Sequence, residues 1–285
     1  MRRVGLAVML VVMSAAPAAA AGPEGTLKRI KDTKTMTLGY RDSSWPFSFT
    51  GDDGKPAGYS VDLCLKIADA VQKDLALPEL RLKWVRVSPA NRIKAVVDGT
   101  IDIECGSTTA SLSRQTLVDF TMATFLDGGS LLTTDASGIE SVVDLGGKRV
   151  GIVPGTTTEG ALREALRRYM ITARMVAVQD HAEGLAALEK GEADAYASDR
   201  TILIGLALRG PGAAKFTLSS QLFSYEVYGF MLRRGDADFR LTANRALSRV
   251  FRSDDIVRIY EKWFGDLGRP TIALQLMYVI SASPE

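Results

Sequence analysis

The sequence predicts an α/β protein built from two lobes. Strand and helix patterns alternate along most of the chain, which is typical of a largely parallel sheet covered by helices. The alternation comes in two blocks, and two short apolar stretches connect them. The chain has 285 residues, enough for two domains of medium size. Its 46% hydrophobic and 24% charged residues are ordinary for a globular protein.

The N-terminus has the pattern of a secretory signal peptide. A basic start, Met1-Arg2-Arg3, precedes an apolar run from Val4 to Met13 and a small-residue stretch from Ala15 to Ala21 with Ala-x-Ala cleavage sites. The run is too short for a stable membrane span. We therefore expect residues 1–21 to be removed on export, to the periplasm if the host is Gram-negative.

Charge gives no indication of a nucleic-acid partner. Loss of Arg2 and Arg3 lowers the formal net charge from +2 to about zero. No basic block with interleaved aromatic residues is present. We expect the mature chain to have no nucleic-acid partner.

The first block begins with a strand pattern at Thr35–Tyr40, where apolar and polar residues alternate. Val61 to Val71 carries apolar residues at helical spacing. Leu80 to Val87 alternates again, Asn91 to Val97 reads as a short helix, and Ile101 to Glu104 as the next strand.

The second block repeats this order. It predicts strands at 149–153, 172–178 and 193–197, and helices at 160–169, 181–190 and 201–208. Beyond it, Tyr228 to Leu232 reads as a strand and Phe239 to Trp263 as one helical segment. The chain leaves the first lobe near 126–134 and returns near 224–230. Two crossings of this kind make a hinge, with a ligand cleft between the lobes.

The segment from Glu104 to Gln115 carries the strongest pattern of a binding site. A strand ends in Ser107, Thr108 and Thr109, and Arg114 follows. Hydroxyls, backbone N–H groups and a guanidinium can converge on a carboxylate. The alternative is a Ser/Thr-rich loop that caps a helix, with Arg114 on a solvated surface.

Two cysteines, Cys64 and Cys105, either pair in an oxidising compartment or serve as small buried hydrophobic residues; their spacing leaves both open. We expect no metal site, because His181 is the only histidine and no ligand cluster surrounds it. We also expect no cofactor: the loop from Gly151 to Gly155 lacks the Gly-Lys-Ser/Thr ending of a phosphate loop.

Several short motifs, in order, resemble one family. Gly58-Tyr59-Ser60-Val61-Asp62-Leu63 resembles the N-terminal signature of extracellular solute-binding proteins that deliver amino acids to ABC importers, although an acidic residue is usual at Ser60. Further segments look like those of glutamate/aspartate-binding members: Arg41–Ser44, Pro46–Phe49, Asn91–Ile93, Glu104–Thr109, Ser113–Gln115, Gly155–Thr157, Asp180–His181 and Trp263–Phe264.

The resemblance implies the type II periplasmic-binding-protein fold. One lobe is then discontinuous, 22–130 with 229–285, and the other is 131–228. It also implies a monomer, and a membrane permease of an ABC importer as partner.

The resemblance further implies roles for eight residues. Arg114 should hold the α-carboxylate of the ligand, assisted by the hydroxyl and N–H of Thr157. Asp199 should face the ammonium, with a carbonyl or hydroxyl from Ser107 and Thr109 nearby. Thr156 or Thr157, and Asp199, are also plausible helix caps.

Arg41 and Arg92 match the positions that contact the side-chain carboxylate, with His181 near that end. Pro89 stands where a hydroxyl residue is more usual, so glutamate, aspartate and their amides all stay open as ligands. Three arginines against a single Asp favour a dicarboxylic amino acid, because a neutral ligand leaves a desolvated arginine without a partner.

The leading interpretation is therefore binding without chemistry. The alternatives are a protein that binds glutamine, asparagine or another polar amino acid, and a dehydratase-type enzyme on the same fold. An enzyme needs a general acid or base in the cleft, for which Glu104, Asp199 and His181 are the candidates.

Overall fold

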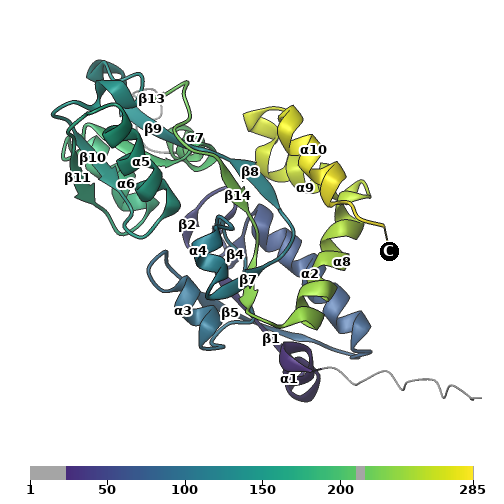
Figure 1. Ribbon diagram of the computed structural model, residues 1–285. Coiled ribbons are helices and arrows are strands. Elements are labelled where there is room, and N and C mark those ends of the chain that lie inside the picture. The colour runs from purple at the N-terminus through teal and green to yellow at the C-terminus, as the bar shows by residue number, and fades with distance from the viewer. Residues whose placement is uncertain (1–23, 210–215, 285) are drawn as a thin grey trace, which may run out of the picture.

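The computed structural model describes residues 24–209 and 216–284. Two lobes lie side by side and are joined by two strands (Figure 1). The predicted signal peptide, 1–21, falls outside the described residues. Within the described ranges, no helix is long and apolar enough to cross a membrane.

The first lobe is built on a five-stranded sheet in the order β5-β1-β6-β15-β7. Its strands are β5 (Arg81–Arg86), β1 (Thr35–Tyr40), β6 (Ile103–Glu104), β15 (Met231–Arg233) and β7 (Val118–Phe120). β1 is parallel to β5 and β6, while β15 is antiparallel to β6 and β7. Because β15 follows the second lobe in the sequence, the first lobe is formed by two separate stretches of sequence.

Helices surround that sheet, and the longer ones bury apolar side chains in its hydrophobic core. They are α1 (Gly25–Thr33), α2 (Tyr59–Asp74), α3 (Arg92–Val97), α4 (Leu112–Gln115), α8 (Ala237–Phe251), α9 (Asp255–Phe264) and α10 (Ile272–Ser281), with a short 3-10 helix η4 (Gly265–Leu267). Apolar side chains of α2 and α8, such as Ile67 and Leu247, are fully buried in the same cluster as Leu38 of β1. A small sheet of β2 (Ser43–Ser44), β3 (Ser48–Thr50) and β4 (Pro56–Ala57) precedes α2.

The second lobe has a sheet in the order β11-β10-β12-β9-β13. The strands are β11 (Arg174–Ala177), β10 (Arg149–Ile152), β12 (Ala195–Asp199), β9 (Gly129–Thr134) and β13 (Phe216–Leu218). α5 (Thr157–Arg168), α6 (His181–Glu189), α7 (Arg200–Arg209) and two 3-10 helices, η1 (Asp135–Ser137) and η2 (Val142–Leu145), complete it. Its cores form around Val150 and Leu162 and around Leu132 and Tyr196.

The two connecting strands form a hinge. β8 (Phe125–Asp127) and β14 (Glu226–Tyr228) pair antiparallel, with Glu226 opposite Asp127. Figure 1 shows both running from one lobe to the other. The two-lobed α/β fold and the double crossing therefore agree with the prediction, while the lobe bounds given above stay a prediction.

Two predicted elements are wrong in extent. Phe239 to Trp263 is not one helix, because the chain turns between α8 and α9. There the Ser253 hydroxyl donates to the Val250 carbonyl at 3.0 Å and accepts the N–H of Asp255 at 3.3 Å. Such local side-chain bonds compete with continued helix.

Tyr228 to Leu232 is not one strand either. Tyr228 ends β14 in the hinge, and β15 begins at Met231 in the sheet of the first lobe. At the change of sheet, the N–H of Gly229 donates to the Thr108 carbonyl at 3.1 Å. The apolar run thus serves two sheets in succession.

Cys64 and Cys105 form a disulfide, with Cα atoms 6.1 Å apart. It ties α2 to the residue that follows β6, immediately before the Ser/Thr loop. Both side chains are also fully buried, so the two cysteines both pair and serve as small buried hydrophobic residues.

Candidate functional site

A cavity lies between the two lobes and is lined by both. Its lining is Arg41, Pro89, Arg92, Ser107, Thr109, Val153, Thr156–Thr158, His181 and Ala197–Asp199. Seven of the eight predicted site residues are in this set; Arg114 is not. The residues come from the loops and helix starts that follow β1, β5, β6, β10 and β11 and from the end of β12, and such segments meet at one edge of each sheet.

Two buried arginines dominate one part of the cavity. Arg41, just after β1, is 2% exposed, and Arg92, the first residue of α3, is 4% exposed. Nη1 of Arg92 donates to the Thr108 hydroxyl at 2.6 Å, and the Nε atoms of both arginines are buried without a hydrogen-bond partner. Burial, and then the charge of Arg92, lowers the pKa of Arg41 to about 10. This end of the cavity holds two positive charges that a carboxylate would stabilise.

Glu104 lies beneath these arginines. It is fully buried, its Oε2 accepts from the Thr108 hydroxyl at 2.8 Å, and its Oε1 has no partner. It does not line the cavity. Its charge raises the pKa of Arg41 and so acts as a partial counter-charge. A carboxyl in this position has no direct access to a ligand.

His181 begins α6, and Asp180 before it caps that helix by accepting the N–H of Glu183 at 2.9 Å. Nδ1 of His181 lies 2.8 Å from the Tyr196 hydroxyl. Burial, followed by the charges of Arg41 and Arg92, lowers the pKa of His181 to about 3. The imidazole is therefore neutral at pH 7 and contributes a hydrogen bond rather than a charge.

Arg114 lies behind the Ser/Thr loop. Its Nη1 donates to the Thr109 carbonyl at 2.9 Å, and it is 7% exposed, not a solvated surface charge. Burial, and then the charge of Arg92, lowers its pKa to about 10. The guanidinium supports the loop, and its contact with a ligand carboxylate stays a prediction.

Asp199 ends β12 and is 8% exposed. Its carboxylate accepts from the Thr158 hydroxyl at 2.9 Å and from the Tyr228 hydroxyl of the hinge. Burial, then the charge of Glu226, raises its pKa to about 6. The alternative role as a cap of α7 falls to Asp127 instead, whose Oδ2 accepts the N–H of Thr201 at 3.2 Å.

The two threonines before α5 divide their roles. Thr156 is the helix cap, since its hydroxyl accepts the N–H of Glu159 at 3.1 Å. Thr157 is the first helical residue, and its hydroxyl donates to Glu226 at 2.8 Å. Its N–H lies at the positive end of α5, where it can donate to an anion, and the contact of Thr157 with a ligand carboxylate stays a prediction.

Glu226 is not among the site residues predicted from the sequence. It is 2% exposed and accepts from Thr109 at 2.6 Å, Thr157 at 2.8 Å and Ser224 at 2.7 Å. The sequence contained one sign of its importance: Glu226 is the single acidic residue in the segment that returns to the first lobe, 224–230, two residues before Tyr228.

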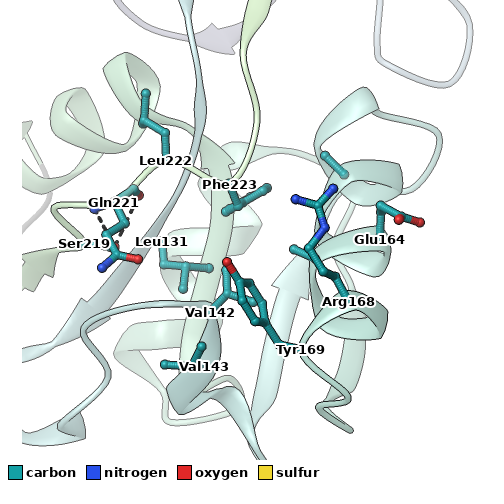
Figure 2. A pocket seen from close by; sticks show the side chains of 12 residues that line it. Leu131, Val142, Val143, Glu164, Arg168, Tyr169, Ser219, Gln221, Leu222 and Phe223 are labelled. Carbon is teal, nitrogen blue, oxygen red and sulfur yellow. Dashed lines mark hydrogen bonds between the residues drawn. The ribbon is translucent and has the colours of Figure 1, made fainter.

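A larger pocket of about 230 Å³ lies in the second lobe (Figure 2). Its lining includes Leu131, Val142, Arg168, Tyr169 and Phe223, and none of the predicted site residues. An occupant there would not bridge the lobes, so it would not favour their closure. Among the described residues, no cluster of His, Cys, Asp and Glu is suited to hold a metal ion.

Two α/β lobes on a two-stranded hinge, with a charged cavity between them, define a bilobal ligand-binding protein. The chain belongs to family 3 of the bacterial extracellular solute-binding proteins, whose family model matches residues 36–266.

Individual relatives agree with this assignment. The chain is 39% identical to an L-glutamate/L-aspartate-binding protein of Pseudomonas aeruginosa over 90% of this chain and 85% of the relative. It is 33% identical to a glutamate/aspartate import solute-binding protein of Salmonella typhimurium over 84% of this chain and 79% of the relative. Among solved structures, an ancestral amino-acid-binding protein, a precursor of cyclohexadienyl dehydratase, aligns with a TM-score of 0.72 at 26% identity, covering 84% of this chain and 100% of the other.

Proposed function

We propose that the protein binds an acidic L-amino acid, glutamate or aspartate, in the periplasm and delivers it to the membrane permease of an ABC importer. The observation that carries the proposal is the pair of buried guanidinium groups, Arg41 and Arg92, at one part of the cavity, with the carboxylate of Asp199 on the same lining. The names of the two relatives described above support the choice of ligand.

The roles follow from charge. Arg41 and Arg92, with neutral His181, would bind the side-chain carboxylate of the ligand. The N–H of Thr157 and the charge of Arg114 would hold the α-carboxylate. Asp199 would face the ammonium, with Ser107 and Thr109 nearby. A neutral side chain would leave the two arginines with only the partial counter-charge of Glu104 in a buried site, at a cost of several kcal/mol.

A ligand that contacts both lobes binds the closed form better than the open one, and only this difference in affinity can drive closure. The closed protein would then dock on the permease as a monomer.

The test is calorimetric titration of the mature protein after unfolding and refolding to remove co-purified ligand. L-glutamate, L-aspartate, L-glutamine and L-arginine are compared. We expect one-to-one binding of glutamate or aspartate at least 100-fold tighter than of glutamine, from the several kcal/mol above. Equal binding of glutamine would overturn the acidic ligand, and turnover of a bound cyclic acidic amino acid would favour a dehydratase.

A further inference from the structure

Glu226 connects the two lobes through hydroxyl groups. Its Oε2 accepts from Thr109, in the loop after β6 of the first lobe, and from Thr157, at the start of α5 in the second, at 2.6 and 2.8 Å. Its Oε1 accepts from Ser224 at 2.7 Å. The side chain does not line the cavity, but both threonines do. Glu226 therefore lies behind the two hydroxyls, on the hinge side.

The hydroxyl protons decide what the threonines offer to the cavity. Each hydroxyl has one proton and two lone pairs, and an ionised carboxylate only accepts. Thr109 Oγ1 and Thr157 Oγ1 are 3.1 Å apart. Either both donate to Glu226, or one donates to the other, which donates to Glu226. In both arrangements the two protons stay within the triangle of Thr109, Thr157 and Glu226, and only lone pairs remain for a ligand.

Two hydroxyl oxygens that accept, together with the carboxylate of Asp199, give three acceptors in the lining of the cavity. A primary ammonium has three N–H donors, so its hydrogen-bonding capacity matches this set. A carboxylate facing these three groups would meet three acceptors and no hydroxyl proton.

We propose that Glu226 is a positioning residue which fixes the hydroxyls of Thr109 and Thr157 as acceptors and thereby selects for the α-ammonium group of the ligand. The inference rests on the proposed function and deepens it. It reassigns the Thr157 hydroxyl from the α-carboxylate to the ammonium and leaves the Thr157 N–H for the carboxylate.

The experiment compares two ligands that differ only in the ammonium. L-glutamate is titrated calorimetrically, and glutarate, which has the same two carboxylates without the amine, is measured by competition. In Glu226→Gln, the amide donates as well as accepts, so the two hydroxyl protons are no longer both held. We expect L-glutamate to bind about 10- to 100-fold more weakly, the usual range for a hydrogen bond to a charged group. Glutarate affinity should stay within about threefold.

Thr157→Val provides a second route if Glu226→Gln folds poorly. It removes the hydroxyl and keeps the backbone N–H, so the inference again expects a loss for L-glutamate and not for glutarate. Asp62→Asn is the control, because Asp62 is a carboxylate that accepts from Lys262 at 2.8 Å and from Trp263 at 2.7 Å and does not line the cavity. Its ratio of glutamate to glutarate affinity should equal that of the unmodified protein.

Each result has one meaning. An equal loss for both ligands in the Gln and Val variants would show that Glu226 only holds the lobes together, and unchanged affinities would show that it orients nothing; either overturns the inference. Failure of the unmodified protein to bind L-glutamate would overturn the proposed function itself, and this inference with it.

Discussion

Replacement of Arg41 by Met should affect stability and affinity in opposite directions. Burial and the charge of Arg92 lower the pKa of Arg41 from 12.5 to about 10. One pKa unit corresponds to about 1.4 kcal/mol, so holding this charge costs the ligand-free protein about 3 kcal/mol. Met fills a similar volume without the charge. We expect the melting temperature of the ligand-free variant to rise by about 6 to 12 °C, from a typical 2–4 °C per kcal/mol at this size.

The same substitution should weaken binding. A ligand carboxylate paired with Arg41 is desolvated, and removal of one partner of such a pair costs about 3 kcal/mol, or roughly 100-fold in affinity for L-glutamate. L-glutamine has no far carboxylate, so its affinity should change by less than about tenfold.

The assay is thermal unfolding with and without L-glutamate, together with calorimetric titration of both ligands. Arg86→Met is the control: Arg86 pairs with Asp42 at 3.2 Å near the same strand end, but its side chain is 69% exposed. It should change neither quantity appreciably. A ligand-free Arg41→Met protein that melts lower than the unmodified one, or a glutamate affinity within twofold, would refute the reasoning.

Three further predictions concern the disulfide, the hinge and lobe closure. The double variant Cys64→Ala, Cys105→Ala should lower the free energy of unfolding by about 4 kcal/mol, which is the loop-entropy value for a 41-residue separation. The measurement is denaturant unfolding under oxidising conditions, and an unchanged midpoint would contradict this prediction. Burial raises the pKa of Asp127 to about 8, so the folded state binds a proton that the unfolded state releases above about pH 4. Stability from this group is present at low pH and is lost as pH rises toward 8. Asp127→Asn should flatten the melting temperature between pH 5 and pH 8, whereas an identical slope would exclude the role of Asp127. A Cβ at Gly205 of α7 would lie 2.2 Å from Cε3 of Trp45, which belongs to the other lobe. Gly205→Ala should therefore disfavour closure and weaken the binding of L-glutamate by about 5- to 100-fold, because overpacking costs about 1–3 kcal/mol. The radius of gyration in the presence of ligand should be larger than that of the unmodified protein, and an unchanged affinity would count against this contact.

Local patterns in the sequence were sufficient for the fold class. The apolar alternation at Thr35–Tyr40 and the helical spacing from Val61 to Val71 each appear in the structure as β1 and part of α2. These patterns are short-range, because a strand or helix buries one face whatever it packs against. Seven predicted residues line the cavity since loops at the strand ends must meet at one sheet edge.

Only the tertiary structure decided which partners these residues have. The break between α8 and α9 and the change of sheet after Tyr228 depend on individual hydrogen bonds. Arg114 faces the Thr109 carbonyl, and the Thr157 hydroxyl faces Glu226, 69 residues away along the chain. The direction of a hydroxyl proton is set by whichever acceptor folding brings within reach. For that reason the sequence determined which residues gather at the cleft, and the three-dimensional contacts determined which of them donate, which accept and which stay charged.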